Sequence, residues 1–246
     1  MRRSTDDLLF VSRKEQGRSF HAARKKTARV GRGKLDRHSG ETPSMKPAAL
    51  GVRMHSGWGV LVAVSGDANS IEVVERKRIV ITDPAIPGAN QPYHHAAGLG
   101  TSELGFRESE KYLASCATVS ERLAFTAIEE VVRAFERQDY RVVGSAVLLA
   151  AGRPLPPLAK ILGSHPLLHT AEGQFFRNAV IQACQRLKLT VAEIRERDLE
   201  DQAKTVFGPA ASQLQRRIAA LGSSIGPPWT KDHKAAALAA LLILAQ

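Results

Sequence analysis

The chain has 246 residues, of which 43% are hydrophobic and 24% charged, and this is the composition of a globular protein. Its longest apolar run, Ala235 to Ala245, is too short to cross a bilayer, and its two cysteines are 68 residues apart without metal-binding spacing. These features exclude membrane-spanning, coiled-coil, collagen and disulfide-rich classes. We expect a cytoplasmic protein with no membrane partner and with both cysteines in the core.

The excess of positive charge is concentrated at the amino terminus. Residues 1–46 carry 13 Lys and Arg against 5 Asp and Glu, whereas residues 47–246 carry 22 against 19. The first segment has no sustained hydrophobic periodicity, so it cannot bury enough apolar surface to offset the entropy of ordering. We predict a basic, disordered leader over 1–46 and a folded domain over 47–246. The leader is either a nucleic-acid-binding arm, a plain tail, or sequence upstream of a later start such as Met45 or Met54.

The first part of the domain has the pattern of β-strands. Residues 48–55 and 58–65 are apolar, β-branched runs separated by a Ser-Gly turn, and a second turn leads into a strand-like segment at 71–82. These three segments predict an antiparallel meander. The next segment, 83–100, contains three prolines and three glycines, which predicts a long loop.

The second part of the domain alternates helical and strand patterns. Apolar residues at three- to five-residue spacing predict a helix over 113–135, and a continuous apolar run at 141–151 is typical of a strand buried on both faces. A second amphipathic helix includes 176–187, and a short strand follows at 190–194. The remaining predictions are helices at 213–221 and 230–244 and a solvated, charged connector at 196–201.

The order of the predicted elements, β-β-β-α-β-α-β-α, indicates an α/β fold with a mixed five-stranded sheet. A three-stranded antiparallel meander would be followed by two crossover units, with helices on both faces. This arrangement resembles the ribonuclease H-like superfamily over residues 48–246. Two local similarities support the resemblance. Residues 50–53 (LGVR) with 57–59 (GWG) are similar to the first hairpin of RuvC-type Holliday-junction resolvases, and 231–236 (KDHKAA) is similar to their last helix.

The resemblance implies metal-dependent cleavage of nucleic-acid phosphodiesters. In that superfamily, carboxylates from the first strand, a middle element and the last helix converge on Mg²⁺ or Mn²⁺, and the two ions stabilise the attacking and leaving oxygens. Here the first-strand aspartate is replaced by Arg53, which cannot bind a metal, and the fourth predicted strand contains no acid. Asp232, at the start of the last helix, matches the pattern.

Other residues offer a replacement site. His169 and Glu172 have i, i+3 spacing on the second predicted helix, and His55 and Asp232 are expected to approach the same edge of the sheet. We predict that Glu172, Asp232 and His169 are the metal ligands and catalytic residues, with His169 as ligand or general base. Arg53 and His55 would bind the substrate. Such a donor set suits Mn²⁺ or Zn²⁺ better than Mg²⁺.

Helix capping gives a plainer interpretation of the same acids. The shared face of His169 and Glu172 requires that Ser164 cap the second helix. If Thr170 is the cap instead, Glu172 is a first-turn acid that interacts with the helix dipole. Asp232 has the same explanation if Thr230 caps the last helix.

A pair of histidines lies in the predicted loop before the first helix. His94 and His95 are followed by Glu103, Glu108 and Glu110, which suggests a metal or substrate lid. Adjacent histidines on an extended chain, however, point in different directions.

Two functions therefore remain open. In the first, the protein is a divergent metal-dependent nuclease or resolvase-like enzyme. In the second, it is a catalytically inactive ribonuclease H-like module that binds nucleic acid or a protein partner, and Arg53 fills the vacated metal site with its own charge. A third option is a role in protein assembly alone. The sequence does not decide the oligomeric state.

Overall fold

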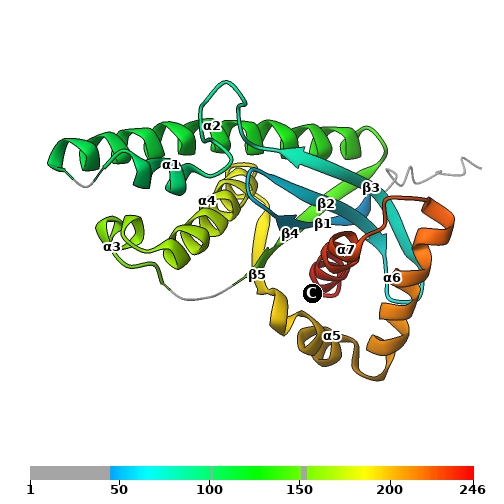
Figure 1. Ribbon diagram of the computed structural model, residues 1–246. Helices are drawn as coiled ribbons and strands as arrows, with labels where there is room; N and C mark the ends of the chain where they lie inside the picture. Colours follow the sequence, from blue (N-terminus) through cyan, green and yellow to red (C-terminus); the bar gives the residue numbers. More distant parts are fainter. Residues whose placement is uncertain (1–44, 101, 151–153) are drawn as a thin grey trace, which may run out of the picture. The chain divides into compact units, whose positions relative to one another are not determined.

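Five strands form one mixed sheet in a computed structural model that describes residues 45–100, 102–150 and 154–246 (Figure 1). The strand order is β3-β2-β1-β4-β5. β1 pairs with β2 and β2 with β3 in antiparallel fashion, whereas β1 with β4 and β4 with β5 are parallel. The predicted mixed five-stranded sheet is therefore confirmed. The strands are β1 (Lys46–Met54), β2 (Trp58–Gly66), β3 (Ile71–Val80), β4 (Tyr140–Leu149) and β5 (Thr190–Arg195).

The central strands are apolar on both faces because helices cover both faces of the sheet. Most residues of β1 and β2 are buried, whereas β3, at the edge, is mostly exposed or half-buried and carries Arg76, Lys77 and Arg78. Charged side chains on an edge strand protect it from pairing with other chains. Gly51 in β1 faces the last helix so closely that an added Cβ would lie 1.8 Å from the carbonyl oxygen of Ala236.

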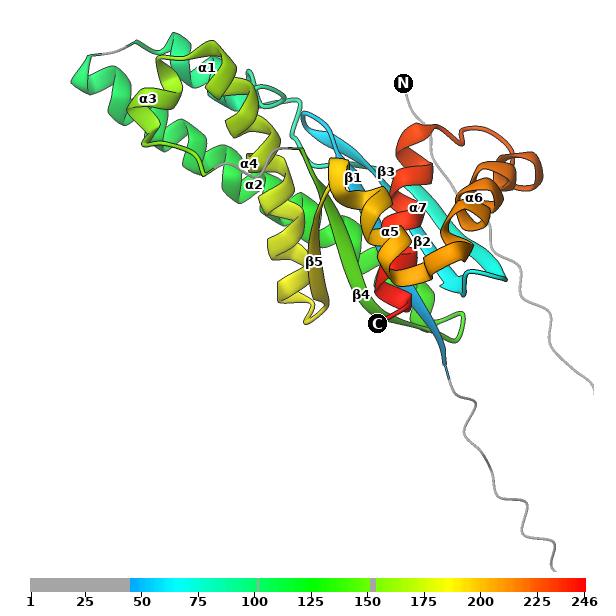
Figure 2. The ribbon, with the colours of Figure 1, turned by 90° about the horizontal axis from the view of Figure 1, so that it is seen from below.

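Seven α-helices lie among the described residues. α2 and α4 pack on one face of the sheet, where Ile128, Phe135, Phe176 and Val180 belong to one hydrophobic core. α7 packs on the other face against β1, β2 and β4, and α5 and α6 flank it (Figure 2). The helices are α1 (Pro92–Gly98), α2 (Glu103–Glu136), α3 (Leu158–Leu162), α4 (His165–Arg186), α5 (Leu199–Phe207), α6 (Ala211–Ile225) and α7 (Lys231–Leu244).

Three segments differ from the prediction, and one of them is α3, for which no helix was expected. The expected loop at 83–100 contains α1, in which Pro92 occupies the first turn and is buried together with Ala96. The expected connector at 196–201 is a short 3-10 helix, Glu196–Asp198, followed by the start of α5, where Leu199 is buried. α1 and the 3-10 helix are short. Packing against the rest of the protein stabilises them, so their sequences show little hydrophobic periodicity.

The helical layer continues beyond the sheet. α2 has 34 residues, which corresponds to about 51 Å, whereas a ten-residue strand spans about 33 Å. Both views place α1, α3 and the start of α4 together at the far end of α2 (Figures 1 and 2). A separate small hydrophobic cluster of Ile161, Leu168 and Ala171 is buried there.

Three further predictions concern composition. The leader at 1–46 lies outside the described residues except for Met45 and Lys46. Cys116 and Cys184 are buried and unpaired, as expected for core residues. In the described part of the chain, no helix combines the length and apolar character needed to span a membrane.

Candidate functional site

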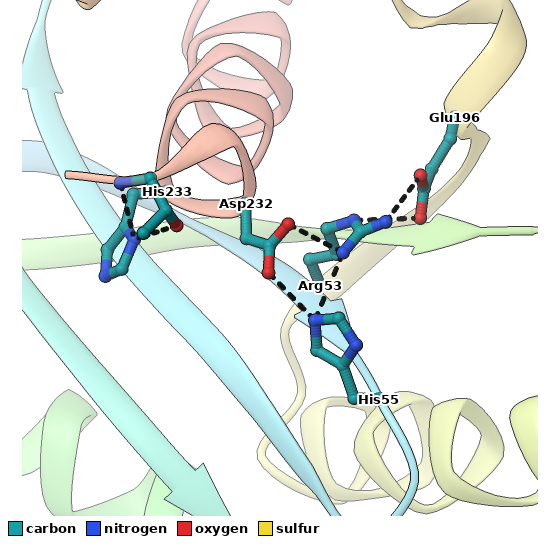
Figure 3. A network of polar contacts seen from close by, with 6 residues as sticks. Arg53, His55, Glu196, Asp232 and His233 are labelled. Carbon is teal, nitrogen blue, oxygen red and sulfur yellow. Dashed lines mark hydrogen bonds and ion pairs between the residues drawn. The ribbon is translucent and has the colours of Figure 1, made fainter. Parts of the chain in front are cut away.

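The guanidinium of Arg53 lies between two carboxylates at the carboxyl edge of the sheet (Figure 3). Its Nε and Nη2 donate to the two carboxylate oxygens of Glu196, each at 3.0 Å, and its Nη1 donates to Oδ1 of Asp232 at 2.6 Å. The side chains of Arg53 and Asp232 are each 21% exposed, and that of Glu196 is 36% exposed. Bidentate, partly buried pairs of this kind are stronger than ordinary surface salt bridges.

The topology explains why these three residues meet. β1, β4 and β5 are parallel, so their carboxyl ends lie at one edge of the sheet. Arg53 is at the end of β1, and Glu196 directly follows β5. α7 brings Asp232 to the same edge because Gly51 allows the backbone of this helix to approach β1.

The start of α7 is fixed by a local cap. Thr230 is the N-cap residue, and its backbone N–H donates to Nδ1 of His233 at 3.3 Å, while the Thr230 hydroxyl lies 2.8 Å from the same nitrogen. Burial and the nearby charge of Arg76 lower the pKa of His233, which favours the neutral ring that this cap requires. Asp232 is then in the first turn of α7, beneath the Thr230 cap as predicted, and faces Arg53 instead of solvent.

His55 extends the network towards the edge strand. Its Nε2 lies 2.8 Å from Oδ2 of Asp232 and 3.1 Å from Nη1 of Arg53. The His55 ring stacks on Trp58 with ring centres 4.3 Å apart, and the guanidinium of Arg78 lies 3.8 Å from the centre of the Trp58 ring. Polar and aromatic contacts therefore run without a break from β3 to Glu196.

This arrangement does not fit the Mg²⁺ or Mn²⁺ centre implied by the resemblance. Both oxygens of Glu196 and one oxygen of Asp232 already accept hydrogen bonds from Arg53. A guanidinium remains charged under all physiological conditions, so a divalent cation at the same place would meet a positive charge and would compete for the same oxygens. β4 supplies no acid either, as predicted.

A second polar cluster joins α1 to α4. Oε1 of Glu172 accepts a hydrogen bond from the backbone N–H of His94 at 3.1 Å and lies 2.7 Å from Nδ1 of the same residue. The Glu172 side chain is only 2% exposed. Burial and the nearby Glu172 carboxylate raise the pKa of Tyr93, which keeps this tyrosine a neutral phenol. His169 is exposed, and its ring centre is 4.6 Å from that of His94.

The structure thus divides the predicted site residues between two places. Asp232, Arg53 and His55 are together at the carboxyl edge of the sheet, whereas Glu172 and His169 belong to the cluster with His94. Among the described residues, no group of histidine, cysteine and acidic side chains with metal-binding spacing includes Asp232. Glu172 and His169 are held away from Asp232 because the first turns of α4 pack against α1.

α4 begins at His165, so the residue that precedes it is its cap. Ser164 is the N-cap residue of α4, although its side chain makes no capping hydrogen bond. The alternative cap, Thr170, is inside the helix and donates its hydroxyl to the carbonyl of Pro166 at 3.0 Å. The first-turn interpretation of Glu172 is therefore wrong, since Glu172 is more than one turn into α4.

Two partners were missed by the sequence reasoning. Glu196 was interpreted as part of a solvated connector, although its place directly after a strand parallel to β4 is a signal for the carboxyl edge. His165 was not considered, although it is four residues before His169 on a predicted helix. That spacing places both rings on one helix face.

A pocket of about 540 Å³ opens beside Arg53. Its wall is apolar where α5, α6 and α7 meet, with Leu199, Ile218 and Leu238. Four cationic side chains and two carboxylates also line it, namely Arg53, Arg197, Lys231, Lys234, Glu196 and Glu200. Lys231 and Lys234 form no salt bridge with any acid in the described ranges.

Comparison with known proteins gives distant structural likenesses only. No protein-family model and no curated protein sequence matches the chain. A solved structure of RuvC from Thermus thermophilus in complex with Holliday junction substrate is similar with a TM-score of 0.45 and 13% identity, over 79% of this chain and 90% of RuvC. Another structure of RuvC from Thermus thermophilus is similar with a TM-score of 0.45 and 11% identity, over 79% of this chain and 91% of RuvC.

Proposed function

We propose that residues 47–246 form a ribonuclease H-like module that binds nucleic acid and does not cleave it by two-metal chemistry. The observation that carries the proposal is the position of Arg53, whose guanidinium bonds both Glu196 and Asp232. The mixed five-stranded sheet, with an antiparallel meander over β1–β3 and parallel β4 and β5, is of the kind that the resemblance implies and supports the assignment of the fold.

Electrostatics favours binding without a metal. Two carboxylates at this edge would repel a phosphate backbone if nothing neutralised them, and in metal-dependent nucleases the divalent ions do so. Here Arg53 takes that role permanently. Lys231 and Lys234 are then available to a phosphate beside the amino terminus of α7, where the helix dipole also favours anions. The net positive charge of residues 1–46 supports the same class of partner.

Binding is tested by fluorescence anisotropy of the full chain with labelled duplex DNA, four-way-junction DNA and single-stranded RNA over a series of salt concentrations. We expect the double variant Lys231→Ala/Lys234→Ala to bind at least about 10-fold more weakly and to have a salt slope smaller by about 2, one unit for each lost phosphate contact. The matched control, Lys111→Ala/Lys160→Ala, removes the same charge from exposed positions on α2 and α3 and should retain binding.

Titration with Mg²⁺ tests whether Arg53 prevents metal binding at this edge of the sheet. Arg53→Asp supplies a third carboxylate in place of the guanidinium, so calorimetry should detect Mg²⁺ binding in this variant and none in the wild-type chain at the same concentrations. Equal binding by the two proteins that is lost in Asp232→Asn would contradict the proposal.

Cleavage is tested on the same nucleic acids with Mg²⁺ and with Mn²⁺, and we expect none. Metal-dependent cleavage that disappears in Asp232→Asn would favour the enzymatic alternative, with a metal held at Asp232. If no nucleic acid is retained even at low salt, the binding proposal is overturned and a protein partner is favoured.

A further inference from the structure

We propose that His94, His165 and His169 form a binding site for a transition-metal ion such as Zn²⁺. One ring nitrogen of each histidine lies within 4.8 Å of a ring nitrogen of both others. The three ring centres are 4.6, 4.6 and 5.3 Å apart. A tetrahedral centre with metal–nitrogen bonds of about 2 Å places its ligand nitrogens about 3.3 Å apart and its imidazole centres about 5 Å apart. The rings therefore need only small rotations to bind one ion.

Two of the ligands come from one helix face. His165 is the first residue of α4 and His169 is four residues later, so successive turns direct both side chains to the same side. Both are exposed, and in the described part of the chain their rings lie against each other and against the His94 ring. Their nitrogens are consequently available to an ion that enters from solvent.

The third ligand is oriented by a buried carboxylate. The contact between Glu172 Oε1 and Nδ1 of His94, at 2.7 Å, leaves Nε2 of His94 as the nitrogen with a free lone pair. The backbone N–H of His94 bonds the same oxygen at 3.1 Å, which holds the start of α1 against α4. A carboxylate behind a metal-bound histidine is the usual outer partner in such sites, and it increases the basicity of the ring. This gives the buried Glu172 a positioning role in place of the metal-ligand role expected from the sequence.

The donor set selects the ion. Three imidazole nitrogens suit Zn²⁺, Cu²⁺ and Ni²⁺, whereas Mg²⁺ and Ca²⁺ require oxygen ligands. Three protein ligands also leave the fourth tetrahedral position open to water or to an anionic group. The site is independent of the Arg53 network, because none of its residues contacts Arg53, Glu196 or Asp232 in the described part of the chain.

The test uses the full chain after removal of metal with a chelator. Co²⁺ is titrated as a spectroscopic probe, and Zn²⁺ is then added in competition, with the bound metal counted by elemental analysis. We expect one ion per chain, the ligand-field absorption of a tetrahedral Co²⁺ centre, displacement by Zn²⁺ and no displacement by excess Mg²⁺. Because Mg²⁺ is inert here, this result does not depend on the proposal made for Arg53.

Variants locate the site. His165→Ala and His169→Ala change exposed side chains and should each weaken Zn²⁺ binding at least about 100-fold without unfolding the protein. Glu172→Gln keeps the shape and one oxygen acceptor and should weaken binding about 10- to 100-fold. The control is His95→Ala, since the His95 ring lies against Tyr112 at 4.4 Å and outside the cluster. Failure to bind Zn²⁺, or binding that survives in both His165→Ala and His169→Ala, would overturn the proposal.

Discussion

Substitution of Gly51 by alanine should separate α7 from the sheet. The added Cβ would lie 1.8 Å from the carbonyl oxygen of Ala236 and 2.7 Å from its carbonyl carbon, so the two backbones must move apart by about 1.5 Å to reach ordinary contact. Neither backbone can turn away, because Gly51 is paired with Val62 and Ala146 in the centre of the sheet and Ala236 is inside a helix. Overpacking costs about 1–3 kcal/mol where side chains can adjust, and a backbone clash belongs at the upper end.

We therefore expect Gly51→Ala to lower the free energy of unfolding by about 3 kcal/mol or more, measured by urea denaturation with far-UV circular dichroism. The matched control is Gly98→Ala at the end of α1, where an added Cβ meets nothing within 4 Å. That variant should be neutral or more stable by about 0.5–1 kcal/mol, because alanine reduces the entropy of the unfolded chain. A loss below about 1 kcal/mol for Gly51→Ala would refute the close approach of α7.

Three other predictions concern the network, a thiol and the helix cap. Arg53→Met removes the guanidinium that pairs with Glu196 and Asp232 and should lower the free energy of unfolding in urea by about 2 kcal/mol. Arg53→Lys should recover part of this loss. Unchanged stability would contradict a structural role for the guanidinium. Burial raises the pKa of the Cys184 thiol from 9.0 to about 11. At pH 8 the reaction of this thiol with an aromatic disulfide should therefore be about 100-fold slower in the native chain than in urea. Equal rates would contradict the burial. Because the pKa of His233 is lowered in the folded state, the unfolded chain takes up the proton first; stability should be complete above about pH 6.5 and decrease as the pH falls through the lowered pKa. His233→Gln keeps a cap acceptor and should remove this part of the pH dependence in thermal unfolding, whereas identical pH profiles would exclude the histidine as its source.

The sheet was predictable because each of its strands leaves a local pattern. β1, β2 and β4 are long apolar runs, and turn residues separate the first three strands, so an antiparallel meander followed by two crossover units follows from the rules for connections. The seven residues of α1 give no such signal, because their helical structure depends on burial of Pro92 and Ala96 against distant helices. Short elements of this kind are visible only once the tertiary structure is known.

The candidate site was predictable in part. The position of Arg53 at the end of β1 and that of Asp232 in the first turn of α7 followed from the element order, and the interpretation of Arg53 as a cation in the metal's place agrees with its two salt bridges. Glu196, which directly follows β5, was missed because it lies in a run of charged residues, and such runs are typical of solvated surface. The contact of His94 with Glu172 joins residues 78 apart, and no spacing rule connects a loop histidine to a helix of such distant sequence.

The helical end beyond the sheet has its own consequence for dynamics. Its hydrophobic cluster contains three buried residues in the described part of the chain, Ile161, Leu168 and Ala171, whereas each face of the sheet is covered by a much larger core. This end should therefore open and close as a separate unit, with amide hydrogens of α1 and α3 exchanging with solvent far faster than those of β1 and β4. An ion bound between α1 and α4 would oppose that opening. Metal binding should therefore slow amide hydrogen exchange at this end and leave exchange in the sheet unchanged.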